Sequence, residues 1–129
     1  MSTRRAIAYF TETPVPSPWD FQERLMLETL VTRIKSTLIY EDPSFWKSRG
    51  VVPSSIAVVA LLRSEMNKLV DFLLDLDSRQ LPAEERKAGV ATYVEDIPWD
   101  DFNADEREFF ADVVSPVIQA AGVDVWLVL

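Results

Sequence analysis

The chain has 129 residues, a formal net charge of −8, and neither cysteine nor histidine. Its length fits one domain, 1–129, and a hydrophobic share of 48% is enough to fill a core. The missing cysteines exclude disulfides, thiolate metal sites and cysteine catalysis. The missing histidines remove the usual general base near neutral pH, so the composition argues against an enzyme.

The apolar runs are too short for a membrane span. The longest, 56–62, has seven residues, whereas a spanning helix needs about 20. Arg4 and Arg5 precede only five apolar residues, which is too few for the hydrophobic region of a signal peptide. We therefore expect no membrane partner and a cytoplasmic location.

In chain order, the first predicted element is a strand over 5–11, which is short, apolar and partly β-favouring. Three prolines then make 13–18 an extended connector. A helix follows over 18–39, with Ser17 as its N-cap and a helical stripe of Leu27, Val31, Ile34 and Leu38. Residues 41–53 are expected to form a loop with a short turn of helix.

The loop contains Phe45-Trp46-Lys47-Ser48-Arg49, which supports two readings. Aromatic and basic side chains together can bind nucleic acid by stacking and by neutralising phosphate. In a chain of net charge −8 that signal is weak, because the overall field repels phosphate. We predict instead that Phe45 and Trp46 plug one end of a helical hairpin, and that nucleic acid is not a partner.

The second helix is predicted over 55–77, capped by Ser54 or Ser55. Its apolar residues follow a heptad spacing: Val59, Leu62, Met66, Leu69, Leu73 and Leu76. Such a stripe needs a facing stripe, so we expect an antiparallel hairpin with the helix over 18–39. The run 56–62 is apolar on nearly all sides and should be buried from several directions, or in an interface.

Residues 82–95 can be read as helix or as strand, and we expect a short helix followed by a strand over 90–94. A third helix begins near Ala104, with Asn103 and Glu106 as a capping box. Pro116 predicts a kink or restart, and Gly122 suits a helix end. The inner stripe of this helix is Phe109, Phe110, Val113, Val114, Val117, Ile118 and Ala121.

Residues 123–129 are β-rich and apolar, so they should be tied into a sheet or a contact. Pairing with 5–11 is the simplest arrangement. The predicted fold class is therefore α+β and mostly helical. It combines an antiparallel helical hairpin and a third helix with a small two- or three-stranded sheet formed by the N- and C-terminal strands.

The negative charge is concentrated in the window 95–112, which holds eight carboxylates and one arginine, a balance of −7. The rest of the chain carries −1. Such a field attracts basic partners, and aromatic residues within it can supply buried area. The predicted partner-binding residues are Glu95, Asp96, Trp99, Asp100, Asp101, Phe102, Asp105, Glu106, Glu108 and Asp112. The alternatives are a solvated loop with an acid-rich helix start, and a divalent-metal site.

Signatures of cofactor chemistry are missing from the sequence. Three glycines cannot build a glycine-rich phosphate loop, and the acidic window does not match a calcium loop. A second acidic cluster consists of Asp71, Asp75 and Asp77, of which the first two lie one turn apart, but these residues also fit the polar side of an amphipathic helix. We therefore expect no cofactor, no catalytic residue and no resident metal ion.

Three functions remain open on the sequence. The favoured one is a non-catalytic protein-binding module, such as an inhibitor, immunity or accessory protein, that presents its acidic surface to a basic partner. The second is a structural subunit of a homo-oligomer or larger particle, assembled through the helix from Val59 to Leu76 or through the C-terminal strand. The third is a carboxylate-dependent metal enzyme.

Overall fold

The computed structural model describes the backbone of residues 18–129 and the side chains of residues 25–129. Within that part the chain forms helices and no strand, so the expected α+β class is wrong there. The elements are α1 (Pro18–Ser36), α2 (Pro43–Ser48), α3 (Ile56–Ser78), α4 (Ala83–Glu95), the 3-10 helix η1 (Trp99–Asp101), α5 (Ala104–Ala120) and the 3-10 helix η2 (Val125–Leu127).

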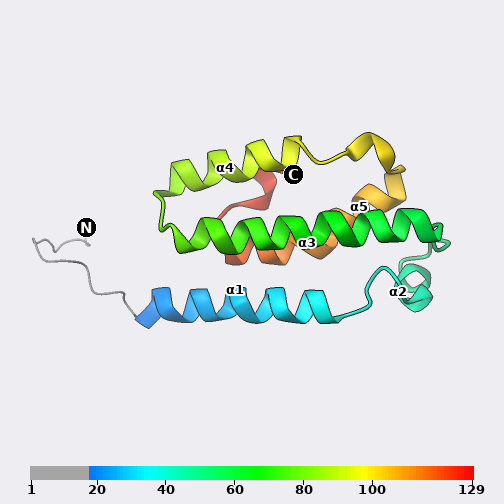
Figure 1. Cartoon of the computed structure of the whole chain (residues 1–129), viewed down its shortest axis with the longest axis horizontal. Helices are drawn as coiled ribbons and strands as arrows, with labels where there is room; N and C mark the ends of the chain where they lie inside the picture. Colours follow the sequence, from blue (N-terminus) through cyan, green and yellow to red (C-terminus); the bar gives the residue numbers. More distant parts are fainter. Residues whose placement is uncertain (1–17) are drawn as a thin grey trace, which may run out of the picture.

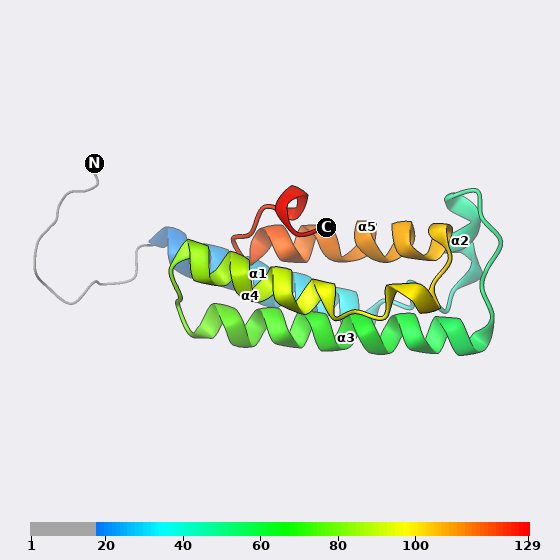
Figure 2. The ribbon, with the colours of Figure 1, turned by 90° about the horizontal axis from the view of Figure 1, so that it is seen from above.

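The four long helices run in alternating directions, and α3 and α5 lie between α1 and α4 (Figures 1 and 2). The antiparallel hairpin of α1 and α3 is confirmed. Helix α2 closes the end of the bundle where α1 leads into α3 (Figure 1). The main core lies between α1, α3 and α5, since these three helices contact one another most extensively.

The predicted stripe of α3 is the centre of this core. Leu62, Met66, Leu69 and Leu73 are fully buried, which confirms the heptad pattern. Because these side chains already face α1 and α5, they are not available to a second copy of the chain. Assembly through the helix from Val59 to Leu76 stays a prediction, and it would use side chains outside this stripe. The run 56–62 is not buried within the chain at its start, where Ile56 is 89% exposed, so burial of this end in an interface stays a prediction.

The C-terminal segment is not a strand. Gly122, with φ +87°, turns the chain after α5, and Asp124 caps η2 by accepting a hydrogen bond from the backbone N–H of Trp126 at 3.0 Å. Val123 and Val125 are buried against the core, while Trp126 is 88% exposed. Hydrophobic contact with the bundle therefore replaces strand pairing. The partner strand predicted over 5–11 lies outside the described residues.

The strand expected over 90–94 is also wrong, because these residues continue α4. Val90 and Val94, one turn apart, are both buried in the core. Gly89 faces α3, and a Cβ there would make an ordinary van der Waals contact with Leu76 Cδ1 at 3.6 Å. The free energy gained by burying these side chains outweighs their preference for a strand, so the segment forms a helix.

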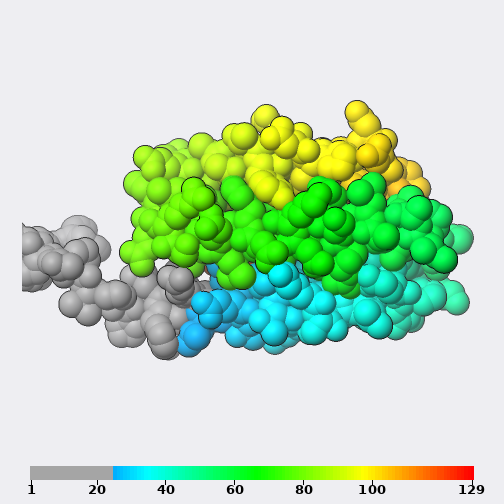
Figure 3. All heavy atoms as spheres, viewed as in Figure 1, coloured from blue at the N-terminus to red at the C-terminus, as the bar shows by residue number. Residues whose placement is uncertain are grey.

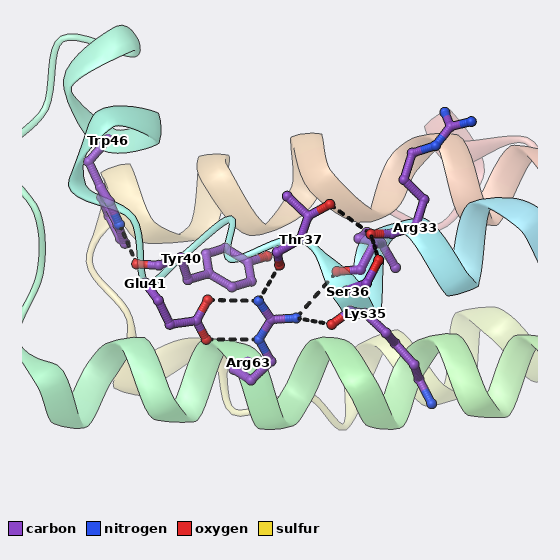
Figure 4. A network of polar contacts seen from close by, with 9 residues as sticks. Arg33, Lys35, Ser36, Thr37, Tyr40, Glu41, Trp46 and Arg63 are labelled. Atoms are coloured by element: carbon purple, nitrogen blue, oxygen red, sulfur yellow. Dashed lines mark hydrogen bonds and ion pairs between the residues drawn. The ribbon is translucent and has the colours of Figure 1, made fainter.

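Helix α1 ends three residues earlier than predicted, and Leu38 is exposed rather than part of its buried stripe. The cause is Arg63 of α3, whose guanidinium donates hydrogen bonds to carbonyl oxygens at the end of α1 and beyond it (Figure 4). The same guanidinium binds Glu41 (Figure 4). These contacts fix where α1 stops and where the chain turns towards α2.

Trp46 of α2 confirms the predicted plug. Its side chain is buried, and its indole Nε1–H donates to the carbonyl oxygen of Tyr40 at 2.8 Å. Its ring meets Phe109 of α5 edge to face, with centroids 4.7 Å apart. Helix α2 is thereby held against α5.

Helix α5 begins with the predicted capping box of Asn103 and Glu106. It does not restart at Pro116, which lies inside a continuous helix. Proline removes one backbone donor but keeps a helical φ, and the buried residues on either side hold the helix together. The predicted inner stripe is buried, apart from a half-buried Val113.

Candidate functional site

The predicted partner-binding residues extend from the end of α4 through η1 into the first half of α5, at one end of the bundle (Figure 1). Glu95 ends α4 and Asp96 is its C-cap. Asp100 and Asp101 belong to η1, and Asp105 lies in the first turn of α5. In the space-filling view, part of the segment between α4 and α5 projects from the surface at the edge of the molecule (Figure 3).

Two of the ten predicted residues do not belong to this surface. Phe102 is 2% exposed, and its ring stacks on Phe110 at 6.4 Å between centroids. Glu106 is 6% exposed, and its carboxylate accepts hydrogen bonds from the backbone N–H of Asn103 and the hydroxyl of Ser54. These residues hold the corner together and do not offer it to a partner.

Trp99 anchors η1 from within. Its indole Nε1–H donates to the carbonyl oxygen of Val94 at 2.8 Å, and its ring meets Phe110 edge to face at 5.6 Å. The side chain is half-buried, so one part of it remains accessible. Trp99 is therefore both a support of the turn and an aromatic contact residue.

Arg107 is the only base in the acidic window, and it is engaged inside the turn. Its Nε–H donates to the carbonyl oxygens of Trp99 at 2.9 Å and Phe102 at 3.0 Å. Its terminal nitrogen is 3.8 Å from Asp100 Oδ1, on a carboxylate that is fully exposed. Arg107 thus fixes the backbone of the turn and leaves most of the surrounding charge uncompensated.

Arg49, the C-cap residue of α2, compensates part of the negative charge at the C-terminal end of the acidic window. Its guanidinium lies 2.7 Å from Asp112 Oδ2 and 4.0 Å from Glu108 Oε1. Sequence reasoning missed this pairing because Arg49 and Asp112 are 63 positions apart. Within residues 25–129, the exposed acids of the window that form no ion pair are Glu95, Asp96, Asp101 and Asp105.

We call these four residues, together with Trp99 and Asp100, the acidic corner. A groove of about 630 Å³ adjoins it. The apolar side chains that line this groove are Val94, Ala111, Val128 and Leu129, and Trp99 also lines it. Its charged residues are Glu95, Glu108 and Arg107, so carboxylates outnumber the single base. The groove is not visible in the sequence, because residues 128 and 129 suit a strand there and reach Val94 and Ala111 only through the tertiary fold. An apolar channel with carboxylates beside it suits arginine or lysine side chains, whose stems are apolar and whose ends are charged.

The carboxylates do not converge on a metal site. In the part of the chain that the structure describes, no three acidic side chains are close enough together to hold a metal ion. Asp71 instead lies 2.5 Å from the ammonium group of Lys35, and Asp75 lies 2.5 Å from the guanidinium of Arg79. The second predicted acidic cluster therefore consists of separate ion pairs on the outer side of α3.

Comparisons with protein families, curated proteins and solved structures found no match for this chain. Among the described residues, no helix combines the length and the apolar character that crossing a membrane requires.

Proposed function

We propose that this protein is a non-catalytic protein-binding module that uses the acidic corner and its groove to hold a basic segment of a partner protein. The observation that carries the proposal is the rigid support of the unpaired carboxylates. Trp99, Arg107 and the capping box fix the backbone that presents them.

A fixed turn favours binding because little conformational entropy is lost when the partner arrives. Exposed charges at the rim mainly accelerate encounter and select against acidic partners, and each contributes only about 0.2–1 kcal/mol. Tight binding of a partner therefore also requires apolar surface that becomes buried in the complex. Trp99 and the lining of the groove supply that area next to the charges.

A synthetic peptide of alternating arginine and leucine tests the proposal by calorimetry at low and high salt. The double variant Asp101→Asn/Asp105→Asn should weaken binding about fivefold at low salt. The matched control is Glu84→Gln/Glu85→Gln, which removes the same charge from exposed positions at the start of α4. Equal losses in the two variants would show that only net charge matters, and would contradict the proposal.

Self-assembly is a second candidate function, carried by a different observation. Val52 and Ile56 are large apolar side chains exposed near the start of α3. A homo-oligomer that covers them would explain this exposure. Light scattering of the wild type and of Ile56→Lys tests it: a monomer at high concentration in both would exclude this route.

A further inference from the structure

A second hollow, separate from the acidic corner, lies between the C-terminal half of α1, helix α2 and the middle of α5. Its volume is about 470 Å³. Its walls are mainly apolar and come from all three helices, including Leu30, Ile34, Phe45, Phe109, Val113 and Val117. Hollows of roughly 300–1,000 Å³ with apolar walls and a few polar groups are typical of small-molecule sites.

The charged side chains of this hollow have the opposite sign to the protein as a whole. Among the described residues, Arg33 and Arg49 line it with Asp112 as the only acid, although the chain carries −8. Arg49 binds Asp112 through one terminal nitrogen at 2.7 Å. A guanidinium has five N–H donors, so Arg49 keeps donors for a further acceptor.

Of the two arginines, Arg33 has fewer interactions with other side chains. Among the described residues it forms no ion pair, and its side chain extends away from the Arg63 clasp (Figure 4). The two hydroxyl groups in the lining are already used, because Thr37 donates to the carbonyl oxygen of Arg33 at 2.7 Å and Ser48 donates to that of Phe45 at 3.0 Å. The donors left for a ligand are therefore those of the arginines.

The walls of the hollow are held by contacts that do not depend on a ligand. Arg49 lies over the ring of Phe109 at 4.7 Å, and Trp46 meets the same ring edge to face. These contacts fix α2 relative to α5. A preformed site of this kind loses little entropy on binding.

We propose that this hollow binds an amphipathic anion, a molecule with an apolar body and one carboxylate or similar group. The apolar body would occupy the space between Leu30, Phe45 and Val113. The anionic group would lie at Arg33 and the free donors of Arg49. Charge-assisted hydrogen bonds to guanidinium are short and strong, which gives the site its preference for anions over neutral analogues.

Decanoate, used below its micellar concentration, is a suitable probe, with 1-decanol as the uncharged control. Titrated into the ¹⁵N-labelled full chain, decanoate should saturate and shift the amide signals of residues 30–37, 45–49 and 109–117. Decanol should bind at least about tenfold more weakly. No saturable binding, or equal binding of both compounds, would overturn the proposal.

Arg33→Gln tests the role of the anion-binding group. Its side chain makes no ion pair among the described residues, so its loss should leave the fold intact while weakening decanoate binding about tenfold. Arg79→Gln, which removes an exposed arginine at the end of α3, is the matched control and should change binding less than about twofold. Equal effects of the two variants would contradict an anion site in this hollow.

Discussion

Arg63 of α3 and Glu41, between α1 and α2, are joined by two parallel hydrogen bonds, Nε to Oε2 at 2.9 Å and Nη2 to Oε1 at 2.7 Å. The same guanidinium donates to the carbonyl oxygen of Thr37 at 2.6 Å (Figure 4). One side chain therefore closes the end of α1, fixes the following turn and attaches both to α3. This clasp positions α2, which forms one wall of the second hollow.

Arg63→Ala should lower the free energy of unfolding by about 2–3 kcal/mol, because carbonyl groups at the end of α1 and the carboxylate of Glu41 lose their donor. Chemical denaturation measures the loss. Arg79→Ala removes an exposed arginine of an i,i+4 pair and should cost less than about 0.5 kcal/mol. A similar small cost for Arg63→Ala would show that the clasp is not needed for stability.

Glu41 makes the clasp sensitive to acid. Hydrogen bonding to Arg63 is the largest influence on its carboxyl group and holds its pKa below the ordinary value of a glutamate. The stabilisation is complete above the ordinary pKa, about 4.3, and decreases as the pH falls through the lower value in the folded protein. Glu41→Gln should therefore be less stable than the wild type at pH 7, and this difference should shrink towards pH 3. A difference that is independent of pH would contradict this account.

Tyr40 carries a buried hydroxyl that has no hydrogen-bond partner within residues 25–129. Burial raises the pKa of this phenol far above its ordinary value, so the group stays neutral. Tyr40→Phe removes an unsatisfied polar atom and should leave the free energy of unfolding unchanged or raise it by up to about 1 kcal/mol. Trp46→Phe is the contrast, because it deletes the indole bond to the Tyr40 carbonyl and should destabilise. A loss of more than about 1 kcal/mol in Tyr40→Phe would reveal a role for the hydroxyl.

Gly122 and Gly50 form a matched pair with positive φ, +87° and +78°. An added Cβ at Gly122 would lie 2.7 Å from a terminal nitrogen of Arg86, whereas at Gly50 it would meet nothing within 4 Å. Both alanine variants should lose about 1–2 kcal/mol from backbone strain. Gly122→Ala should lose more, because Arg86 is held by the carbonyl oxygens of Ala121 and Leu81. If the Gly122→Ala and Gly50→Ala variants had the same melting temperature, this role of Arg86 would be contradicted.

The sequence predicted the elements whose signals are local and agree with one another. The stripe of α3 and the capping box of α5 each combine a helical pattern with suitable end residues, and both are confirmed. The strands predicted over 90–94 and 123–129 were wrong because their signal was β-propensity alone. At Val90 and Val94, and at Val123 and Val125, burial against neighbouring helices determines the structure instead.

The site was predictable only in part, for a related reason. The run of acids is visible along the chain, but the charges that compensate it come from elsewhere, as Arg49 shows. The burial of Phe102 and Glu106 depends on contacts with Phe110 and Ser54. Spacing in the sequence locates a charged segment, whereas tertiary contacts decide which of its residues can meet a partner.

The acidic corner is tested most directly by mapping where a basic ligand binds. Adding the arginine–leucine peptide to the ¹⁵N-labelled protein should shift the amide signals of residues 94–108, 128 and 129, with a saturable concentration dependence that weakens at high salt. Signals of α1 should remain in place. Shifts spread evenly over the exposed acids of the whole chain, or centred on α1 and α2, would show that the corner is not a binding surface.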